Sequence, residues 1–367
     1  MKVLFLIPYP LHKAPSQRFR FEQYLSFFQQ NGYQCIAEPF LSEATWNIFY
    51  KNGNHFKKAG GICKGFVNRI KLLFKIKEFD IIFIHREACF IGPAIFEWAY
   101  SLLSNRKIIF DFDDAIWLHD VSDANIALGW LKSPAKTATI IQKAGSIIAG
   151  NAYLAEYAKK FNQNTFIIPT TIDTNYHKPK AKGETKDYIT LGWTGSSTTI
   201  KHFEEIIPVL KKIKNKYKEK VRILLISDKS LKSEAIGLEF ITWNKETEID
   251  DLSKIDVGIM PLPDDKWSKG KCGFKGLQYM ALNIPTIMSP VGVNKEIIEN
   301  RINGFLASTE EEWIEKLSLL IESQELREKI GKAGRQTVIE RYSVESQKEN
   351  YLAVFNSIAM NKVQHKQ

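Results

Sequence analysis

Residues 189–203 read ITLGWTGSSTTIKHF, an apolar run that passes through a turn of small residues into a helical pattern. This order predicts a buried strand, a turn and a helix, which together form one βα unit. Backbone N–H groups at the start of such a helix attract an anion such as a diphosphate. The GxxG spacing in the turn also suits a simple connection between elements. The GxGxxG fingerprint of dinucleotide-binding enzymes occurs nowhere in the chain.

The same alternation of apolar runs and helical patterns continues in both directions. It predicts parallel sheets buried on both faces, in two doubly wound, Rossmann-like α/β domains. The predicted strands lie near 2–8, 34–38, 80–85, 107–112, 145–149, 165–168, 188–193, 221–227, 237–242, 256–260 and 284–288. The predicted helices lie near 17–31, 63–77, 91–103, 131–143, 151–161, 199–215, 273–282, 294–300, 309–322, 325–339 and 344–360.

A polar segment with Pro and Gly, YHKPKAKG at 176–183, predicts a linker between the domains. The 367 residues also exceed the ~150 of one typical domain. We therefore expect an N-terminal domain at 1–176 and a C-terminal domain at 184–343. A helix at 344–360 is expected to pack back across the linker. Ligands should bind at the carboxyl ends of the strands, in a central cleft that the two domains face.

The composition excludes several classes of protein. With 44% apolar and 25% charged residues the chain is neither fibrous nor disordered. No apolar run approaches the ~20 residues of a spanning helix. The N-terminal apolar run is interpreted as a retained first strand rather than a signal peptide. The four cysteines are scattered, without metal-site spacing, which fits a cytoplasmic protein.

The net charge of +10 is concentrated in the first half, where residues 1–180 carry 22 Lys and Arg against 14 Asp and Glu. Residues 51–77 hold eight of these basic residues and no acid. Apolar and basic residues alternate at helical spacing over 61–77. Such a helix can rest on an anionic membrane surface, or it can pack on the sheet while its lysines reach solvent. Both interpretations stay open. Because no RNA- or DNA-binding motif is present, we expect no nucleic-acid partner.

A second informative stretch, KGKCGFKGLQYMALNIPTI at 269–287, places Lys271 and Lys275 near the start of a helix. The helix dipole disfavours cations there unless an anion neutralises them. This favours an anion-binding role over a solvated basic turn.

Charged residues also end two predicted strands of the first half, in IIFIHRE at 81–87 and IIFDFDDA at 108–115. Asp113, Asp114 and Glu87 are candidate general bases for an acceptor hydroxyl. The alternative is a helix cap or an ion pair with Arg86. None of the seven histidines forms a catalytic pair in local sequence.

Arg18 and Arg20 follow the first strand and, with Arg86, could contact phosphates or the acceptor, because guanidinium groups bind phosphate bidentately. A solvated helix start is an equal alternative for residues 16–20. The Asp111-x-Asp113 pair imitates a metal-binding motif, but its position in the first half argues against that role, and we expect no metal.

The second half, taken as a set of motifs, resembles a known family. The strand, GxxG turn and helix of 189–203 precede GFK, MALNIPTI, VGVNKEII and NGFL, the last ending at residue 306. This order over 188–345 is similar to the C-terminal domain of GT-B-fold retaining glycosyltransferases of family 4, the glycosyl transferases group 1 type. A weaker resemblance covers the first half.

The resemblance implies transfer of a sugar from a UDP- or GDP-linked donor, held by the C-terminal domain, to a glycan or lipid-linked acceptor held by the N-terminal domain. It implies retention at the anomeric carbon, no metal and no cofactor, and a role in bacterial cell-surface polysaccharide synthesis. The enzyme would act in the cytoplasm, or at the inner face of the membrane. The donor-binding candidates are Thr194, Gly195, Ser196, Lys201, Lys271, Lys275 and Gln278.

Two departures qualify this resemblance. The family's two glutamates correspond to Gly270 and Gln278, and Thr194 stands where the family has an arginine. Lys271 and Lys275 could replace the missing phosphate clamp. The alternative is a protein that keeps the scaffold and binds nucleotides or glycans without catalysis.

Overall fold

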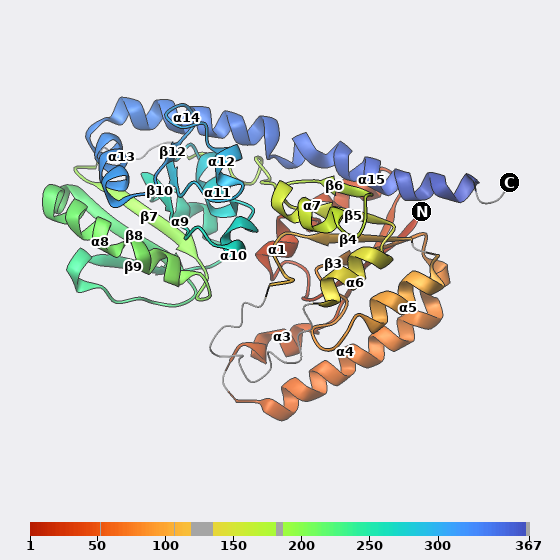
Figure 1. The fold of residues 1–367 in the computed structure, drawn as a ribbon. Coiled ribbons are helices and arrows are strands. Elements are labelled where there is room, and N and C mark those ends of the chain that lie inside the picture. Colours follow the sequence, from red (N-terminus) through yellow and green to blue (C-terminus); the bar gives the residue numbers. More distant parts are fainter. Residues whose placement is uncertain (52, 106, 119–134, 181–185, 365–367) are drawn as a thin grey trace. The chain divides into compact units, whose positions relative to one another are not determined.

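The computed structural model describes residues 1–51, 53–105, 107–118, 135–180 and 186–364. Contacts divide the chain into two compact units (Figure 1). The first domain is Met1–Thr170 with Gln347–Gln367, and the second is Thr171–Ser346.

The first domain is built on six parallel strands in the order β2-β1-β3-β4-β5-β6. Their bounds are β1 Lys2–Ile7, β2 Gln34–Pro39, β3 Ile81–His85, β4 Ile108–Phe112, β5 Ser146–Ala149 and β6 Thr165–Ile167. Its helices are α1 Pro15–Arg18, α2 Leu25–Gln30, α3 Glu43–Phe49, α4 His55–Lys75, α5 Ile95–Leu103, α6 Ala135–Lys143 and α7 Ala152–Lys159. The inner strands are fully buried because runs of Ile, Leu and Phe face helices on both sides.

The second domain also has six parallel strands, in the order β12-β11-β10-β7-β8-β9. They are β7 Ile189–Gly195, β8 Val221–Ser227, β9 Leu238–Thr242, β10 Val257–Met260, β11 Thr286–Met288 and β12 Phe305–Leu306. The helices are α8 Ile200–Tyr217, α9 Glu248–Leu252, α10 Lys266–Lys269, α11 Phe274–Ala281, α12 Asn294–Ile297, α13 Glu310–Glu322 and α14 Gln324–Arg341. Helix α15, Val344–Gln364, follows them and belongs to the first domain from Gln347 on.

All the predicted strands are present, within two residues at each end, and only the two-residue β12 was missed. The single helix predicted at 17–31 is wrong. The chain there forms α1, a 3₁₀ turn at Glu22–Tyr24 and α2, because Arg20 and Phe21 turn into the core between them. The short helices α3, α9 and α10 were also missed. Residues 131–134 of the predicted helix 131–143 lie outside the described residues.

The segment predicted as a linker belongs in part to the second domain. His177 is fully buried, and its carbonyl accepts a hydrogen bond from Arg335 Nη1 at 2.8 Å. Ile172 bridges to Ser343 in a parallel pairing. The two units therefore separate between Thr170 and Thr171, earlier than the expected position at 176. Residues 181–185 lie outside the described residues.

The last helix, α15, completes the core of the first domain. Phe355 stacks on Phe28 with 4.5 Å between ring centroids, and Tyr351 lies 4.5 Å from Tyr24. All four rings are fully buried. The chain therefore returns to its first domain after completing the second. Among the described residues no helix is both long and apolar enough to cross a membrane.

Candidate functional site

Each sheet has one point where the strand order reverses. In the first sheet β1 has β2 on one side and β3 on the other, and in the second sheet β7 lies between β8 and β10. Connections leave to opposite faces at such a point, so the carboxyl ends of these strands frame a crevice where ligands bind. Arg86 follows β3, and the turn at 196–199 follows β7.

Arg86 joins the two carboxylates that follow β4. Its Nε donates to Asp113 Oδ1 at 2.7 Å and its Nη2 to Asp114 Oδ2 at 2.9 Å. Burial raises the pKa of Asp113, but the Arg86 guanidinium outweighs burial and lowers that pKa to about 2. A carboxylate with so low a pKa is a weak base. The predicted general-base role therefore does not fit Asp113, and the ion pair left open from the sequence is the one present.

Arg20 lies in the core rather than on the surface, which corrects its predicted phosphate contact. Its side chain is fully buried, and its Nη2 contacts Asp111 Oδ1 at 2.5 Å. The other oxygen of Asp111 contacts His85 Nδ1 at 2.7 Å. Arg18 ends α1, with its guanidinium carbon 4.9 Å from the centroid of the Phe19 ring.

His85 was not selected from the sequence. Its Nδ1 is held by Asp111, and its buried Nε2 has no hydrogen-bond partner among the described residues. Neutral imidazole with Nδ1 protonated leaves Nε2 as an acceptor. The isolated position of His85 in the sequence gave no signal, because Asp111 is 26 residues away along the chain.

Glu87 lies beside the same strand ends and is paired with a lysine. Lys136 Nζ donates to Glu87 Oε2 at 3.1 Å and lies 3.7 Å from the buried Glu97. Burial lowers the pKa of Lys136, but Glu97 and Glu87 raise it above its usual value. Lys136 therefore stays charged and keeps Glu87 in place.

An aromatic group borders these charges and was also missed. Tyr9 follows β1 and lies 4.7 Å from Trp46 and 5.3 Å from Phe90, centroid to centroid. The Tyr50 hydroxyl donates to the Tyr9 hydroxyl at 3.1 Å. Burial raises the pKa of both tyrosines, and the nearby Arg86 offsets only part of this rise. Rings with polar edges next to charged groups form the kind of surface that binds hydroxyl-rich ligands.

In the second domain the turn after β7 satisfies its own N–H groups. Ser196 N donates to Thr199 Oγ1 at 3.2 Å, and Thr194 N donates to the Tyr279 hydroxyl at 2.7 Å. Ser197 N donates to Asp228 Oδ1 at 2.5 Å. The expected free N–H of Ser196 is therefore engaged. A diphosphate would have to replace Thr199 as its acceptor.

Three predicted lysines from two segments of the chain lie around one histidine. Burial lowers the pKa of His202, and Lys275, Lys201 and Lys271 lower it further, to about 4. Lys275 Nζ lies 5.1 Å from the centroid of the Trp193 ring, on β7. The starts of α8 and α11 thus bring three cations together around a neutral histidine. His202 had been set aside from the sequence because it stands alone there.

The side chain of Gln278 is engaged inside the second domain. It is buried, and its Nε2 lies 3.4 Å from Glu248 Oε1 and 3.5 Å from His177 Nε2. The predicted contact of Gln278 with the donor does not fit this arrangement, because the amide already bonds inside the fold. The family resemblance pointed to Gln278 but gave no sign that its amide would contact Glu248 and His177.

Among the described residues no three His, Cys, Asp or Glu side chains gather as metal ligands. Asp111 and Asp113, which imitate a metal-binding pair, contact different cations, Arg20 and Arg86. The structure therefore gives the two carboxylates separate roles.

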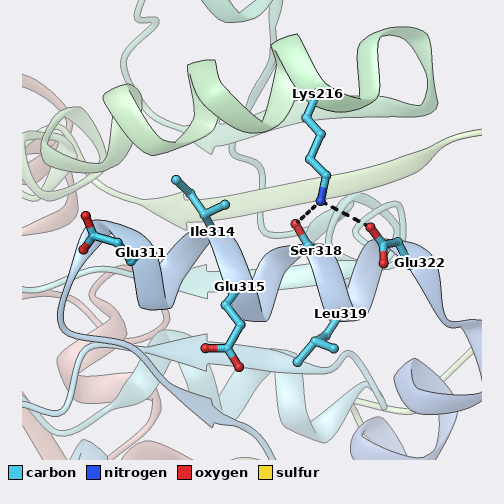
Figure 2. Close-up of a pocket in the computed structure, with 7 residues that line it drawn as sticks. All are labelled: Lys216, Glu311, Ile314, Glu315, Ser318, Leu319 and Glu322. Carbon is cyan, nitrogen blue, oxygen red and sulfur yellow. Dashed lines mark hydrogen bonds and ion pairs between the residues drawn. The ribbon is translucent and has the colours of Figure 1, made fainter.

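A shallow hollow of about 430 Å³ lies between α8 and α13 on the second domain (Figure 2). Lys216 reaches from α8 to Ser318 Oγ at 3.1 Å and Glu322 Oε1 at 3.3 Å. Lys216 is near the end of α8, and α8 returns from the end of β7 to the start of β8. The hollow is therefore separate from the lysine site, which surrounds the start of α8.

Comparison with protein families identifies the second domain. Residues 175–337 match the family model described as Glycosyl transferases group 1. The second domain is a glycosyl transferases group 1 domain. The expected glycosyl transferases group 1 domain, and the expectation of a glycosyltransferase, are confirmed. No curated protein matches this glycosyltransferase by sequence.

Solved structures share the fold over almost all of this chain. A glycosyltransferase from Rickettsia africae ESF-5 has a TM-score of 0.72 at 16% identity, covering 98% of this chain and 99% of that one. HepE from Anabaena with UDP-glucose has a TM-score of 0.70 at 12% identity, covering 97% and 100%. Sucrose-phosphate synthase from Thermosynechococcus elongatus has a TM-score of 0.68 at 12% identity, covering 98% and 100%. The predicted GT-B fold of two Rossmann-like domains is confirmed.

Proposed function

We propose that this glycosyltransferase transfers a sugar from a UDP- or GDP-linked donor to a glycan or lipid-linked acceptor, with retention at the anomeric carbon and without a metal. The observation that carries the proposal is Lys275, whose Nζ lies 5.1 Å from the centroid of the Trp193 ring on β7. Lys201 and Lys271 act together with it on His202 at the start of α8. Three cations at a strand-order reversal can neutralise a diphosphate as it leaves. The binding of UDP-glucose by HepE, which shares the fold, supports a nucleotide sugar as donor.

In this reaction the bond between the anomeric carbon and the diphosphate oxygen breaks, and an acceptor oxygen forms the new bond. The acceptor hydroxyl loses its proton to a base. Of the three predicted carboxylates Glu87 stays the candidate base, while Arg86 with Asp113 and Asp114 would position the acceptor. We further propose that the enzyme contributes to cell-surface polysaccharide synthesis, acting in the cytoplasm or at the inner face of the membrane.

Thermal unfolding with UDP, GDP, CMP and NAD, each with and without EDTA, tests the donor site. A nucleotide at ~100 times its dissociation constant should stabilise by ~2.7 kcal/mol. We expect UDP or GDP to raise Tm with or without EDTA, and Lys275→Ala to abolish the increase. The matched control is Lys229→Ala, an exposed lysine after β8. An unchanged UDP response in Lys275→Ala would refute the lysine site.

The second candidate is a binding protein without catalysis, favoured by Gly270 and Gln278 at the positions of the family's glutamates and by the engaged amide of Gln278. Incubation with radiolabelled UDP- and GDP-sugars and total membrane lipid or glycan separates the two. Labelled product supports transfer, and NMR of its anomeric proton tests retention. Nucleotide binding without any product or donor hydrolysis would favour the binding protein.

A further inference from the structure

Helix α4 carries two apolar stripes on opposite sides. The inner stripe packs into the first domain through Gly65, Arg69 and Leu72. The outer stripe is exposed: Phe56 is 95% and Phe74 is 85% accessible, and the other large apolar side chains on it are Val67 and Ile70. The residues of the inner stripe already hold α4 on the first domain, so the exposed side chains of the outer stripe are not needed for its core.

The outer stripe follows the helical period. Positions 56, 60, 63, 67, 70 and 74 alternate in steps of four and three, which places them on one line along the helix. The sequence left open whether the apolar residues of 61–77 pack on the sheet or face outward. The structure shows that α4 does both, with different residues.

Helix α5 extends this apolar face. Ile95, Trp98 and Leu102 recur in steps of three and four, and Trp98 is 49% and Leu102 67% exposed. The two helices lie side by side in the first domain (Figure 1), joined by Phe66 and Phe96 with 5.9 Å between ring centroids. The outer stripes of these two neighbouring helices are here called the α4–α5 face.

A row of lysines borders this face. Lys57, Lys64 and Lys71 each follow a stripe position by one residue and are seven residues apart, two helical turns. All three are exposed. Phe66, which contacts α5, points to the other side of the stripe at about 100° per residue. The lysines therefore form the rim away from α5, and residues 51–77 contain no acid to offset them.

We propose that the α4–α5 face docks on the surface of an anionic lipid bilayer, with both outer stripes at the headgroup boundary and the lysine rim on the lipid phosphates. Apolar side chains bordered by lysines suit such a surface, and Trp98 suits its interface. The inference rests on the proposed function only for its purpose, access to a lipid-linked acceptor.

Flotation of the full chain with vesicles tests the face. The vesicles contain phosphatidylcholine alone or with phosphatidylglycerol. We expect binding to the anionic vesicles that weakens with salt. Phe74→Ser with Leu102→Ser should abolish it. Lys64→Gln with Lys71→Gln should weaken it about 30-fold, from the loss of two lysines near an anionic surface.

The matched control is Ile302→Ser with Ile339→Ser, which removes two exposed apolar side chains from the second domain. It should bind like the parent chain. No binding of the parent chain at low salt, or equal binding by all variants, would overturn the proposal. A dimer that Phe74→Ser with Leu102→Ser converts to a monomer would assign the face to a second copy instead. UDP-induced stabilisation, measured on the same variants, should be unchanged. If UDP does not stabilise the parent chain, the donor site is refuted, but the conclusion on vesicle binding still holds.

Discussion

Arg86 shows how much a single side chain organises in the first domain. It holds Asp113 and Asp114 together after β4, with about a quarter or less of each side chain exposed. Its backbone is left-handed, with φ at 60°, and its N–H donates to Asp111 O at 2.7 Å. The guanidinium is thereby fixed where the strands end.

We expect Arg86→Gln to lower the free energy of unfolding by about 1–3 kcal/mol, because two mostly buried carboxylates lose a shared cation. Urea unfolding of the first domain measures the effect. Arg301→Gln, which breaks an exposed ion pair with Glu315, is the control and should cost less than about 1 kcal/mol. Equal costs would show that Arg86 is not a structural cation.

His202 gives the second domain a pH-dependent stability. The pKa of His202 is about 4, which is below the usual value, so the unfolded chain binds the proton of this histidine more readily than the folded one. The contribution of neutral His202 to the stability of the second domain is therefore complete above about pH 6.5 and is lost as pH falls toward 4. His202→Gln should therefore flatten the fall of stability over this range, by up to about 1.4 kcal/mol per pH unit. Tm measured at several pH values, beside the exposed-histidine control His55→Gln, tests this. Parallel pH profiles for the parent chain and His202→Gln would contradict it.

At the scale of elements, β7 and α11 meet closely at Gly195. A Cβ there would lie 2.2 Å from Trp193 Cη2 and 2.8 Å from Lys275 Cε, which is closer than real contacts allow. The missing side chain therefore lets Lys275 lie against the end of β7. This packing keeps one lysine of the donor site in place.

We expect Gly195→Ala to destabilise the second domain by about 1–3 kcal/mol through overpacking, and to weaken UDP binding by displacing Lys275. Tm with and without UDP reports both effects. Gly60→Ala is the control, since nothing lies within 4 Å of its Cβ and alanine favours the helix. If Gly195→Ala has the Tm and the UDP response of the parent chain, Trp193 and Lys275 can move aside for the added Cβ without loss of stability, and the prediction is wrong.

For the whole molecule, the return of α15 to the first domain links the chain's end to its beginning. Phe355 is fully buried and stacks within 4.5 Å of Phe28. We expect Phe355→Ala to cost about 3–5 kcal/mol and to lower hydrogen-exchange protection in the first domain alone. Ile339→Ala, at a partly exposed position on α14, should leave both domains protected. Equal loss in both domains would contradict this division.

The sequence by itself determined the strands, the two sheets and the family of the second domain, because apolar period, turn residues and motif order are local properties of the chain. It also located most charged residues of the site at strand ends. Only the tertiary structure decided which of them meet. Arg20 and Asp111 are 91 residues apart, and Arg20 became a core residue while Arg86 stayed at the strand ends. The convergence of Lys201 and Lys275, and the outward stripe of α4, likewise depend on where the packed elements direct each side chain, which residue spacing alone does not fix.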